Sequence, residues 1–462
     1  MAAKQFLSLL CATTLLSGCM EGGLGDSLGG GFNFTPPHLA DDVPTTTRDA
    51  GPESSGQSDS VSITKPADNQ SVDLEKPANG EVLKTLVARR SVLPAGSAYD
   101  KVGRAALAAG SRTAETELRS AKLRAEAENK NWLPTISPSI SLTSLGETLA
   151  SLVVDQVLYD NGKRKAERAY AAADVEVAAV SLSQDQNNRV YNALRLYLTG
   201  LRGDEKSTTS EGAIRQMRHF KRIVDGRVAG GVSDKGDQRM VEGKLLDLKA
   251  DRDLAHEEAT VARAELQAML GANAAPAKVT PLKTYAPAGV ESLTVLKAEA
   301  EAKRTVAQAT AERAAQLPGL SASGTINRNG TAGGLNAGTT MGLGFGTKAR
   351  LDAIENSKET ARENVVEARE AARRNHSRLE QRLVSLQRQE AETARLVREG
   401  RQTFSLFQSQ FKAGQRSVLE VVNTYEQLTR REMERLDAKY DVILVQLELA
   451  RDLGVLADGG EI

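Results

Sequence analysis

Residues that could act in acid–base or metal chemistry are few and scattered in this chain. No two of its four histidines stand at the spacing of a local metal-binding motif, and they are His38, His219, His256 and His376. No serine lies in a nucleophile motif, and no two carboxylates are placed by their surroundings for acid–base work. The sequence therefore predicts no enzyme activity, no metal site and no cofactor.

One glycine-rich segment could be mistaken for a phosphate-binding loop. Gly342, Gly344 and Gly346 precede Thr347-Lys348, between an expected strand and an expected helix. The segment lacks the Gly-Lys-Ser/Thr order of such loops, and Gly346 has a counterpart, Gly162, at the same place in the first half of the chain. We interpret it as a strand-to-helix turn.

The N-terminus does predict a chemical modification. Lys4 precedes the apolar stretch Phe6–Leu16, which is too short to span a bilayer. Leu16-Ser17-Gly18-Cys19 resembles the lipobox of bacterial lipoproteins, so residues 1–18 would be removed and the thiol of Cys19 would carry a diacylglycerol. Met20 favours an outer-membrane location, because inner-membrane lipoproteins typically have an aspartate at this position. An ordinary secretory signal that has a cysteine near its cleavage site is the alternative. Cys11 lies in the removed segment, which leaves no cysteine pair for a disulfide or zinc.

Composition limits the partners and the fold class. The chain has 60 basic and 60 acidic residues, and this balance argues against a nucleic-acid partner. Aromatic residues make up only 4%, while Ala, Leu, Glu, Arg, Lys and Gln are abundant, as is typical of long helices. Residues 19–93 are rich in Gly, Ser, Pro, Thr and Asp, and we expect them to form a flexible lipid-anchored tether.

The remainder of the chain is a tandem repeat. Leu133-Pro134 recurs as Leu317-Pro318, and Gly162 recurs as Gly346, in each case 184 residues later. Three further pairs are 183 residues apart, and they are Gly231 with Gly414, Asp237 with Glu420, and Gly271 with Gly454. A shift of a single residue reconciles all five pairs. We therefore divide the chain into repeats 94–275 and 276–457, followed by a tail, 458–462.

Each repeat contains two expected strands. Apolar and hydroxyl residues alternate over 136–143 and, more weakly, over 320–327, and return strands are expected at Leu149–Tyr159 and Leu335–Phe345, with a turn signal at Asn329-Gly330. Each strand has about the ten residues that a tilted membrane-spanning strand needs. Four strands leave two open edges, which lipid does not tolerate, so a single chain must oligomerise.

The helices show coiled-coil spacing. Apolar residues recur at alternating intervals of four and three between Leu379 and Phe411, between Val422 and Gly454, and between Val241 and Met269. A continuous helix from Lys348 to Phe411 would be roughly 100 Å long at 1.5 Å per residue. The predicted fold class is mainly α with a small β part: long helical coiled-coil hairpins plus four membrane-spanning strands per chain.

Phe411–Asn423 resembles the helix-turn-helix of the TolC-like outer-membrane efflux family, and Ala438–Asp441 with Leu453–Leu456 resembles its closing pattern. Gly162-Lys163-Arg164, straight after a strand, is a second family feature, and the resemblance covers residues 97 to 457. It implies a homotrimer that forms one twelve-stranded barrel in outer-membrane lipid above a periplasmic helical tunnel. It also implies the exit duct of a tripartite efflux or type I secretion system, with a periplasmic adaptor and an inner-membrane pump as partners.

The resemblance also implies site residues. Phe411 stands where the family can have a gate tyrosine, Arg416 matches a gate arginine, and Glu420, Asn423 and Asp237 match acidic gate positions. Phe411 cannot donate a hydroxyl hydrogen bond, and Asn423 removes a charge. The alternative is that Asp237 and Glu420 are ordinary acids at helix starts, favoured by the helix dipole.

Two turns resemble the tips that meet an adaptor in the family. Their residues are Gly230, Gly231, Val232 and Ser233 in the first repeat and Gly414, Gln415 and Ser417 in the second. Ordinary turn chemistry, in which glycine permits positive φ, is the alternative. Trp132, the only tryptophan, is expected either at a membrane interface or packed at a helix end.

Two other function classes compete with the duct. A periplasmic adaptor would have one coiled-coil hairpin beside a lipoyl-like domain, whereas this chain has two helical halves, each with its own strand pair. An envelope scaffold lipoprotein would leave the alternating strands unexplained. The duct accounts for both features.

Overall fold

The structure is a computed structural model that describes residues 80–461 except 111, 143–147, 272–279, 329, 340, 341 and 343. The chain divides into two units, Met1–Asn69 and Gln70–Ile462, and the described residues belong to the second unit. The expected signal peptide, Cys19 and the tether up to residue 79 lie outside the described residues.

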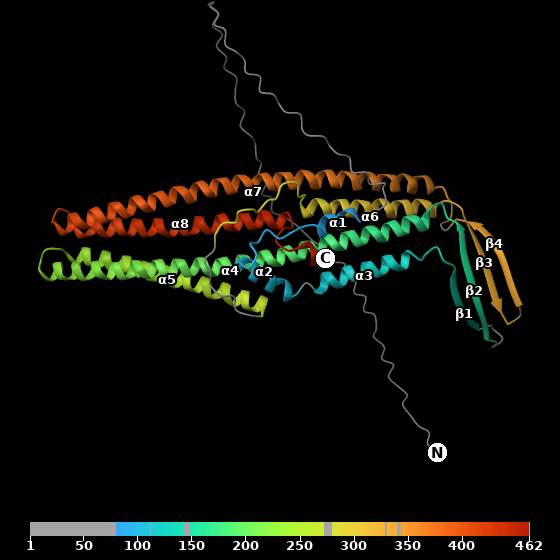
Figure 1. The fold of residues 1–462 in the computed structure, drawn as a ribbon, viewed down its shortest axis with the longest axis horizontal. Coiled ribbons are helices and arrows are strands. Elements are labelled where there is room, and N and C mark those ends of the chain that lie inside the picture. Colours follow the sequence, from blue (N-terminus) through green and yellow to red (C-terminus); the bar gives the residue numbers. More distant parts are fainter. Residues whose placement is uncertain are drawn as a thin grey trace, which may run out of the picture. The chain divides into compact units, whose positions relative to one another are not determined.

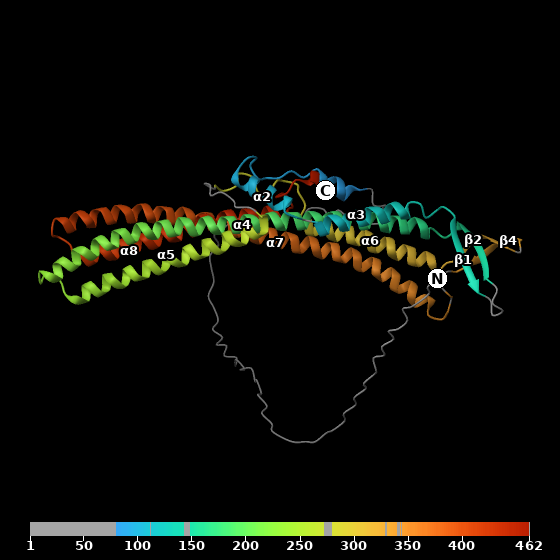
Figure 2. The same ribbon diagram turned by 90° about the horizontal axis from the view of Figure 1, so that it is seen from below.

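Two helical hairpins dominate the second unit. Helix α4 (Lys163–Ala229) turns into α5 (Lys235–Leu270), and α7 (Thr347–Lys412) turns into α8 (Val418–Asp452). With 67 and 66 residues, α4 and α7 are each roughly 100 Å long at 1.5 Å per residue. In two views at right angles, α7 lies along α8 and then along α6 (Leu293–Ala315) (Figure 1 and Figure 2). Among the described helices, none has both the length and the apolar character needed to cross a membrane.

The four strands form one antiparallel sheet in chain order. They are β1 (Thr135–Leu142), β2 (Thr148–Tyr159), β3 (Gly319–Asn327) and β4 (Gly330–Gly338). The sheet joins the two repeats, because β2 of the first repeat pairs with β3 of the second. Each Leu-Pro pair directly precedes a strand, with helices α3 (Arg112–Glu128) and α6 before them.

One expected strand is placed wrongly. The second return strand was expected at Leu335–Phe345, but β4 spans Gly330–Gly338. Asn327 pairs directly with Gly330, so the chain reverses immediately after β3. The sequence pattern hardly indicates the position of β4, because this strand is rich in glycine and alanine and has almost no apolar alternation.

The repeat pairs occupy equivalent positions in the structure. Gly162 and Gly346 precede the first residues of α4 and α7. Gly231 and Gly414 occupy the turns between the paired helices with φ of 71° and 74°, a left-handed conformation that glycine adopts at little cost. The mainly helical fold with a small strand part, and its repeated order of elements, are therefore confirmed.

The helices pack around a row of buried residues. Where α4 meets α8, the side chains of Leu194, Leu198, Ile443 and Leu447 are fully buried. Nearer the tips, α4, α5 and α8 share a second cluster that the aromatic rings of α7 cover. Gly203 permits close approach of α4 and α5, because a Cβ atom there would lie 2.5 Å from the Ala255 carbonyl oxygen.

The folded body begins before the expected end of the tether at residue 93. Helix α1 (Glu81–Val87) buries Val82 and Leu86 against α4 and α6. The Arg89 guanidinium donates to the Leu453 and Glu291 carbonyl oxygens at 2.6 and 2.8 Å. The expected tail is also part of this body, because the Ser91 amide donates to Asp458 and the Gly459 amide donates to the Arg89 carbonyl. Residues 81–93 are ordered because partners distant in the sequence cover their apolar side chains.

Candidate functional site: a two-faced sheet and the helical tips

Most side chains on one face of the sheet are apolar. The register sets Ile136 opposite Val154, and Leu152 opposite both Pro138 and Ile326. Five large apolar side chains with exposed fractions from 36% to 77% share this face, and they are Ile136, Ile140, Leu152, Ile326 and Leu335. Because alternate side chains of a strand point to opposite faces, this face suits a hydrocarbon environment.

The other face carries hydroxyl and amide groups. Ser139 and Ser151 share a hydrogen bond of 2.7 Å between their Oγ atoms, and the Asn336 amide donates to the Ser323 hydroxyl at 2.8 Å. Asp155 lies on the same face, opposite Thr135 on one side and Ser323 on the other. This face suits water, so the sheet is built to separate an apolar medium from an aqueous one.

Both sides of the sheet are open. Among the described residues, β1 and β4 each pair with a strand on one side only, so each presents a row of unpaired backbone groups. Two exposed aromatic side chains lie at the end of the sheet that joins the helices: Trp132, 61% exposed, precedes β1, and Tyr159 ends β2. The side chain of Trp132 is therefore not packed at a helix end within the chain.

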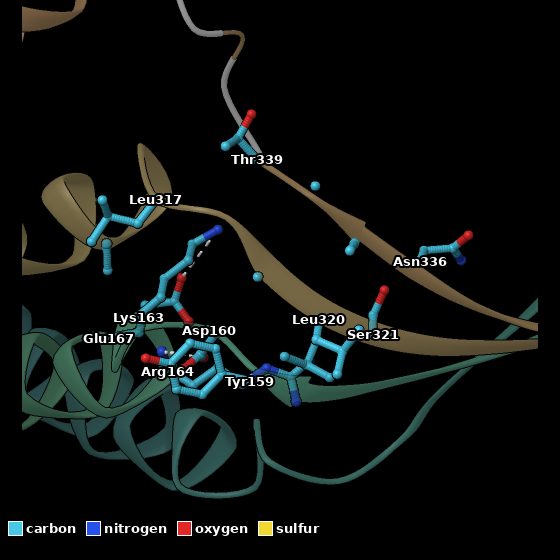
Figure 3. Close-up of a pocket in the computed structure, with 15 residues that line it drawn as sticks. Tyr159, Asp160, Lys163, Arg164, Glu167, Leu317, Leu320, Ser321, Asn336 and Thr339 are labelled. Atoms are coloured by element: carbon cyan, nitrogen blue, oxygen red, sulfur yellow. Dashed lines mark hydrogen bonds and ion pairs between the residues drawn. The ribbon is translucent and has the colours of Figure 1, made fainter.

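A group of charged residues, called the polar collar below, lies where the sheet meets α4 (Figure 3). It surrounds a cavity of about 510 Å³ whose charged lining consists of Asp160, Lys163, Arg164 and Glu167. Asp160 accepts from the Gly162 and Arg164 amides at 3.0 and 2.8 Å and so caps α4. Burial raises the pKa of Glu167, and the nearby Lys163 opposes this shift. Two carboxylates and two cations leave the collar without net formal charge.

At the other end of the helices, two of the expected gate residues are in contact. The Arg416 guanidinium lies 2.8 Å from a carboxylate oxygen of Glu420, donates to Gln410 at 2.8 Å and covers the Phe407 ring at 3.7 Å. Glu420 also accepts from the Ser417 amide at 2.9 Å, in a capping box that begins α8. The Ser417 backbone hydrogen bond, with help from the Ser417 hydroxyl and Arg416, lowers the pKa of Glu420.

The remaining expected gate residues are placed apart from this pair. Phe411 is half-buried against the cluster shared by the tips, and Asn423 is exposed on α8. Asp237 lies on the other hairpin, in the first turn of α5, where its amide donates to Asp234. Within the described part of the chain, no hydrogen bond or ion pair joins Asp237 or Asn423 to Arg416 or Glu420.

The two turns expected to meet an adaptor lie at the exposed ends of the hairpins. The Val232 amide donates to the Arg227 carbonyl, and the Gln415 amide donates to the Gln410 carbonyl, which closes each preceding helix in the same way. Val232 is the large apolar residue exposed there, whereas Ser417 serves as the N-cap of α8. The turns therefore have equivalent backbones and different side chains.

Residues 287–455 match the model of the family described as outer membrane efflux protein. The second repeat is therefore similar to the outer membrane efflux protein family. Among curated proteins, none matches the chain significantly.

Solved structures extend the likeness to both repeats. CusC, a protein that undergoes transmembrane channel formation, gives a TM-score of 0.65 at 18% identity over 80% of this chain and 96% of its own. The outer membrane protein VceC of Vibrio cholerae gives 0.65 at 16% identity over 77% and 96%. The MtrE outer membrane channel of Neisseria gonorrhoeae gives 0.61 at 16% identity over 83% and 90%. The fold of the outer membrane efflux channels therefore covers both halves of the chain, and the expected resemblance to this family is confirmed.

Asp155 is a functional candidate that the sequence pattern alone does not indicate. The signal was present, because Asp155 is the only charged residue in the four strands of the efflux-protein fold. It becomes noticeable only once the strands and their faces are known, since a single acid among serines resembles any exposed strand residue.

Proposed function

We propose that the protein is the outer-membrane exit duct of a tripartite efflux or type I secretion system. Cys19 would carry the lipid anchor, and a periplasmic adaptor with an inner-membrane pump would supply the cargo and the energy. The observation that carries the proposal is the sheet, apolar on one face and hydroxyl-rich on the other, directly continuous with helices roughly 100 Å long. Conduction through such a duct is passive and needs no catalytic residue.

The unpaired sides of the chain support association of several copies, and the resemblance to the efflux channels implies that the number of copies is three. Helix α4 packs against α5 and α8, and α8 packs against α7, so α5 and α7 are the outer helices of the paired hairpins. Three copies joined edge to edge would pair β4 of one copy with β1 of the next and give twelve strands.

The outer helices carry apolar side chains that a neighbouring copy would cover. On α5 these are Met240, Leu246, Leu254 and Val261, and on α7 they are Val366, Val384 and Leu406. Helix α5 already buries a different apolar face against α4, formed by residues such as Leu245, Leu248 and Ala259. A helix with two apolar faces in a polar environment needs a second partner.

The helical tips would form the periplasmic end of the duct. The Arg416–Glu420 pair and Phe411 support a closed arrangement of the α7–α8 tip, while Asp237 and Asn423 would line the opening from α5 and α8. The exposed turns at Gly231 and Gly414 would meet the adaptor. That Asp237 and Glu420 are helix-start acids remains the alternative for those two positions.

Reconstitution tests the proposed function directly. Protein extracted in detergent should be a trimer by native mass spectrometry, and it should give discrete conductance steps in planar bilayers. A water-soluble monomer that gives no conductance would contradict the duct and would favour an adaptor or scaffold.

A further inference from the structure

We propose that Asp155 is the residue that gives the strand-lined part of the duct a preference for cations, with three copies forming one ring. This inference rests on the proposed trimeric duct and adds a selectivity-determining residue to it. The chemical class it favours is a positively charged solute or metal cation.

Asp155 is the only charged residue in β1, β2, β3 and β4. Ionisable side chains are rare in membrane-spanning segments and, where present, face an aqueous interior rather than lipid. A strand pattern of serine, threonine and glycine needs no aspartate for its own stability. The position of this single acid therefore calls for a functional reason.

The register places the Asp155 carboxylate on the hydroxyl-rich face. Its cross-strand neighbours are Thr135 on β1 and Ser323 on β3, and the Thr135 hydroxyl donates to the Asp155 backbone carbonyl at 3.3 Å. Among the ion pairs of the described residues, none involves Asp155. The charge is therefore not neutralised by an ion-pair partner among the described residues.

Among the described residues, the other nearby charges leave the proposed Asp155 ring as the main fixed charge of the strand-lined part. The collar below the sheet contains Asp160 and Glu167 with Lys163 and Arg164, so its charges balance. Arg328 lies in the turn after β3, five residues beyond the level of Asp155, or roughly 17 Å at the rise of a strand. That separation exceeds the Debye length of about 10 Å at 0.1 M salt.

The expected strength of the cation preference follows from the radius of the proposed ring. Twelve strands spaced by about 4.8 Å and tilted by about 40° enclose a cylinder with a radius of roughly 12 Å. Three negative unit charges at that distance in water raise the ratio of cation to anion concentration on the axis by about threefold at 0.1 M salt and about tenfold at 0.01 M. At 1 M, where the Debye length is about 3 Å, the effect disappears.

The test compares reversal potentials of full-length protein in planar bilayers under a KCl gradient. Asp155→Asn should lower the K⁺/Cl⁻ permeability ratio by about threefold at 0.1 M and leave it unchanged at 1 M. Asp155→Lys should shift the preference toward Cl⁻. Adding Ser151→Asp to Asp155→Asn moves the charge along the same face and should restore the cation preference.

The outcomes separate this inference from the proposed function. Normal conductance steps with an unchanged permeability ratio in Asp155→Asn would overturn the Asp155 ring and leave the duct intact. Absence of conductance in the wild-type protein would overturn both. If Asp155→Asn alone gave no channels, Asp155→Lys and the Ser151→Asp double variant would still report the sign of the effect, and an unaltered preference in them would reject the ring.

Discussion

Arg416, in the turn before α8, and Glu420, in the first turn of α8, form an ion pair of 2.8 Å at the tip of the second hairpin. The same guanidinium reaches back to Gln410 in the last turn of α7 and lies over Phe407. Arg416 therefore ties the end of α7 to the beginning of α8. An exposed ion pair alone contributes little stability, but a cation that bridges two helices and an aromatic ring restricts how they can separate.

Removing Arg416 should loosen the closed tip. We expect Arg416→Ala to raise the conductance of the resting channel severalfold in planar bilayers, because Gln410 and Phe407 lose the group that connects them to α8. Arg430→Ala is the matched control, since Arg430 forms an exposed pair with Glu426 farther along α8. Equal increases in both variants would show that Arg416 is an ordinary surface cation.

The capping box gives the tip a dependence on pH. The folded state lowers the pKa of Glu420 from its ordinary value of 4.5, so this carboxylate stabilises the tip above that value. The stabilisation is lost as the pH falls through the lower folded-state pKa. Glu420→Gln should therefore increase hydrogen exchange of the tip amides at pH 7, and the difference from wild type should shrink as the pH falls below 4.5.

Ser417→Ala removes the other half of the box and should destabilise the first turn of α8 by about 1 kcal/mol. Glu434→Gln, which changes an exposed acid farther along α8, is the control for both variants. A pH-independent difference for Glu420→Gln would mean that the carboxylate's charge is not what stabilises the turn.

The repeated architecture could be predicted because it depends on local signals. Leu-Pro before each strand and the glycines at each turn act through backbone conformation, which short segments determine. The packing of α1 into the folded unit could not be predicted in the same way. Burial of Val82 and Leu86 depends on Leu118, Ala179 and Leu293, which are distant in sequence, while the flanking composition indicates a loop.

The candidate site was predictable only in part for a similar reason. The Ser417-x-x-Glu420 spacing indicates a capping box, so the positions of Glu420 and Arg416 at a helix start follow from the sequence. The contact of Arg416 with Gln410 and Phe407 requires the turn geometry that folds α8 back on α7. Asp155 required the register of three strands, one of which belongs to the other repeat.

The outer face of α5 should be a subunit interface. We expect Leu254→Asp to convert the detergent-extracted trimer to monomer without unfolding it, because the side chain is 68% exposed in the single chain. Thr260→Asp adds the same charge on another exposed side of α5 and should leave the trimer intact. Native mass spectrometry distinguishes the two results, and a stable Leu254→Asp trimer would place the interface elsewhere.

The lipid anchor can be tested without reference to the fold. Cys19→Ala should abolish incorporation of labelled fatty acid, because Cys19 would be the only cysteine left after cleavage. The protein should still reach the cell envelope, since its signal peptide is unchanged. Labelling that persists in the variant would reject the lipoprotein interpretation while leaving the channel fold unaffected.

The two faces of the sheet lead to a prediction about neighbouring residues with opposite surroundings. Ser139 and Ile140 are adjacent on β1, yet Ser139 points to the hydroxyl-rich face and Ile140 to the apolar face. In a Cys11→Ala, Cys19→Ala background, Ser139→Cys should react with a water-soluble, positively charged thiol reagent and reduce the single-channel conductance. Ile140→Cys should react slowly and leave the conductance unchanged, because its thiol would face lipid and lie outside the conducting path. Both substitutions are small and lie on the same strand, so a difference in folding cannot account for a difference in labelling. If the two positions reacted alike, or if Ile140→Cys alone blocked the channel, the assignment of the hydroxyl-rich face to the aqueous interior would be wrong.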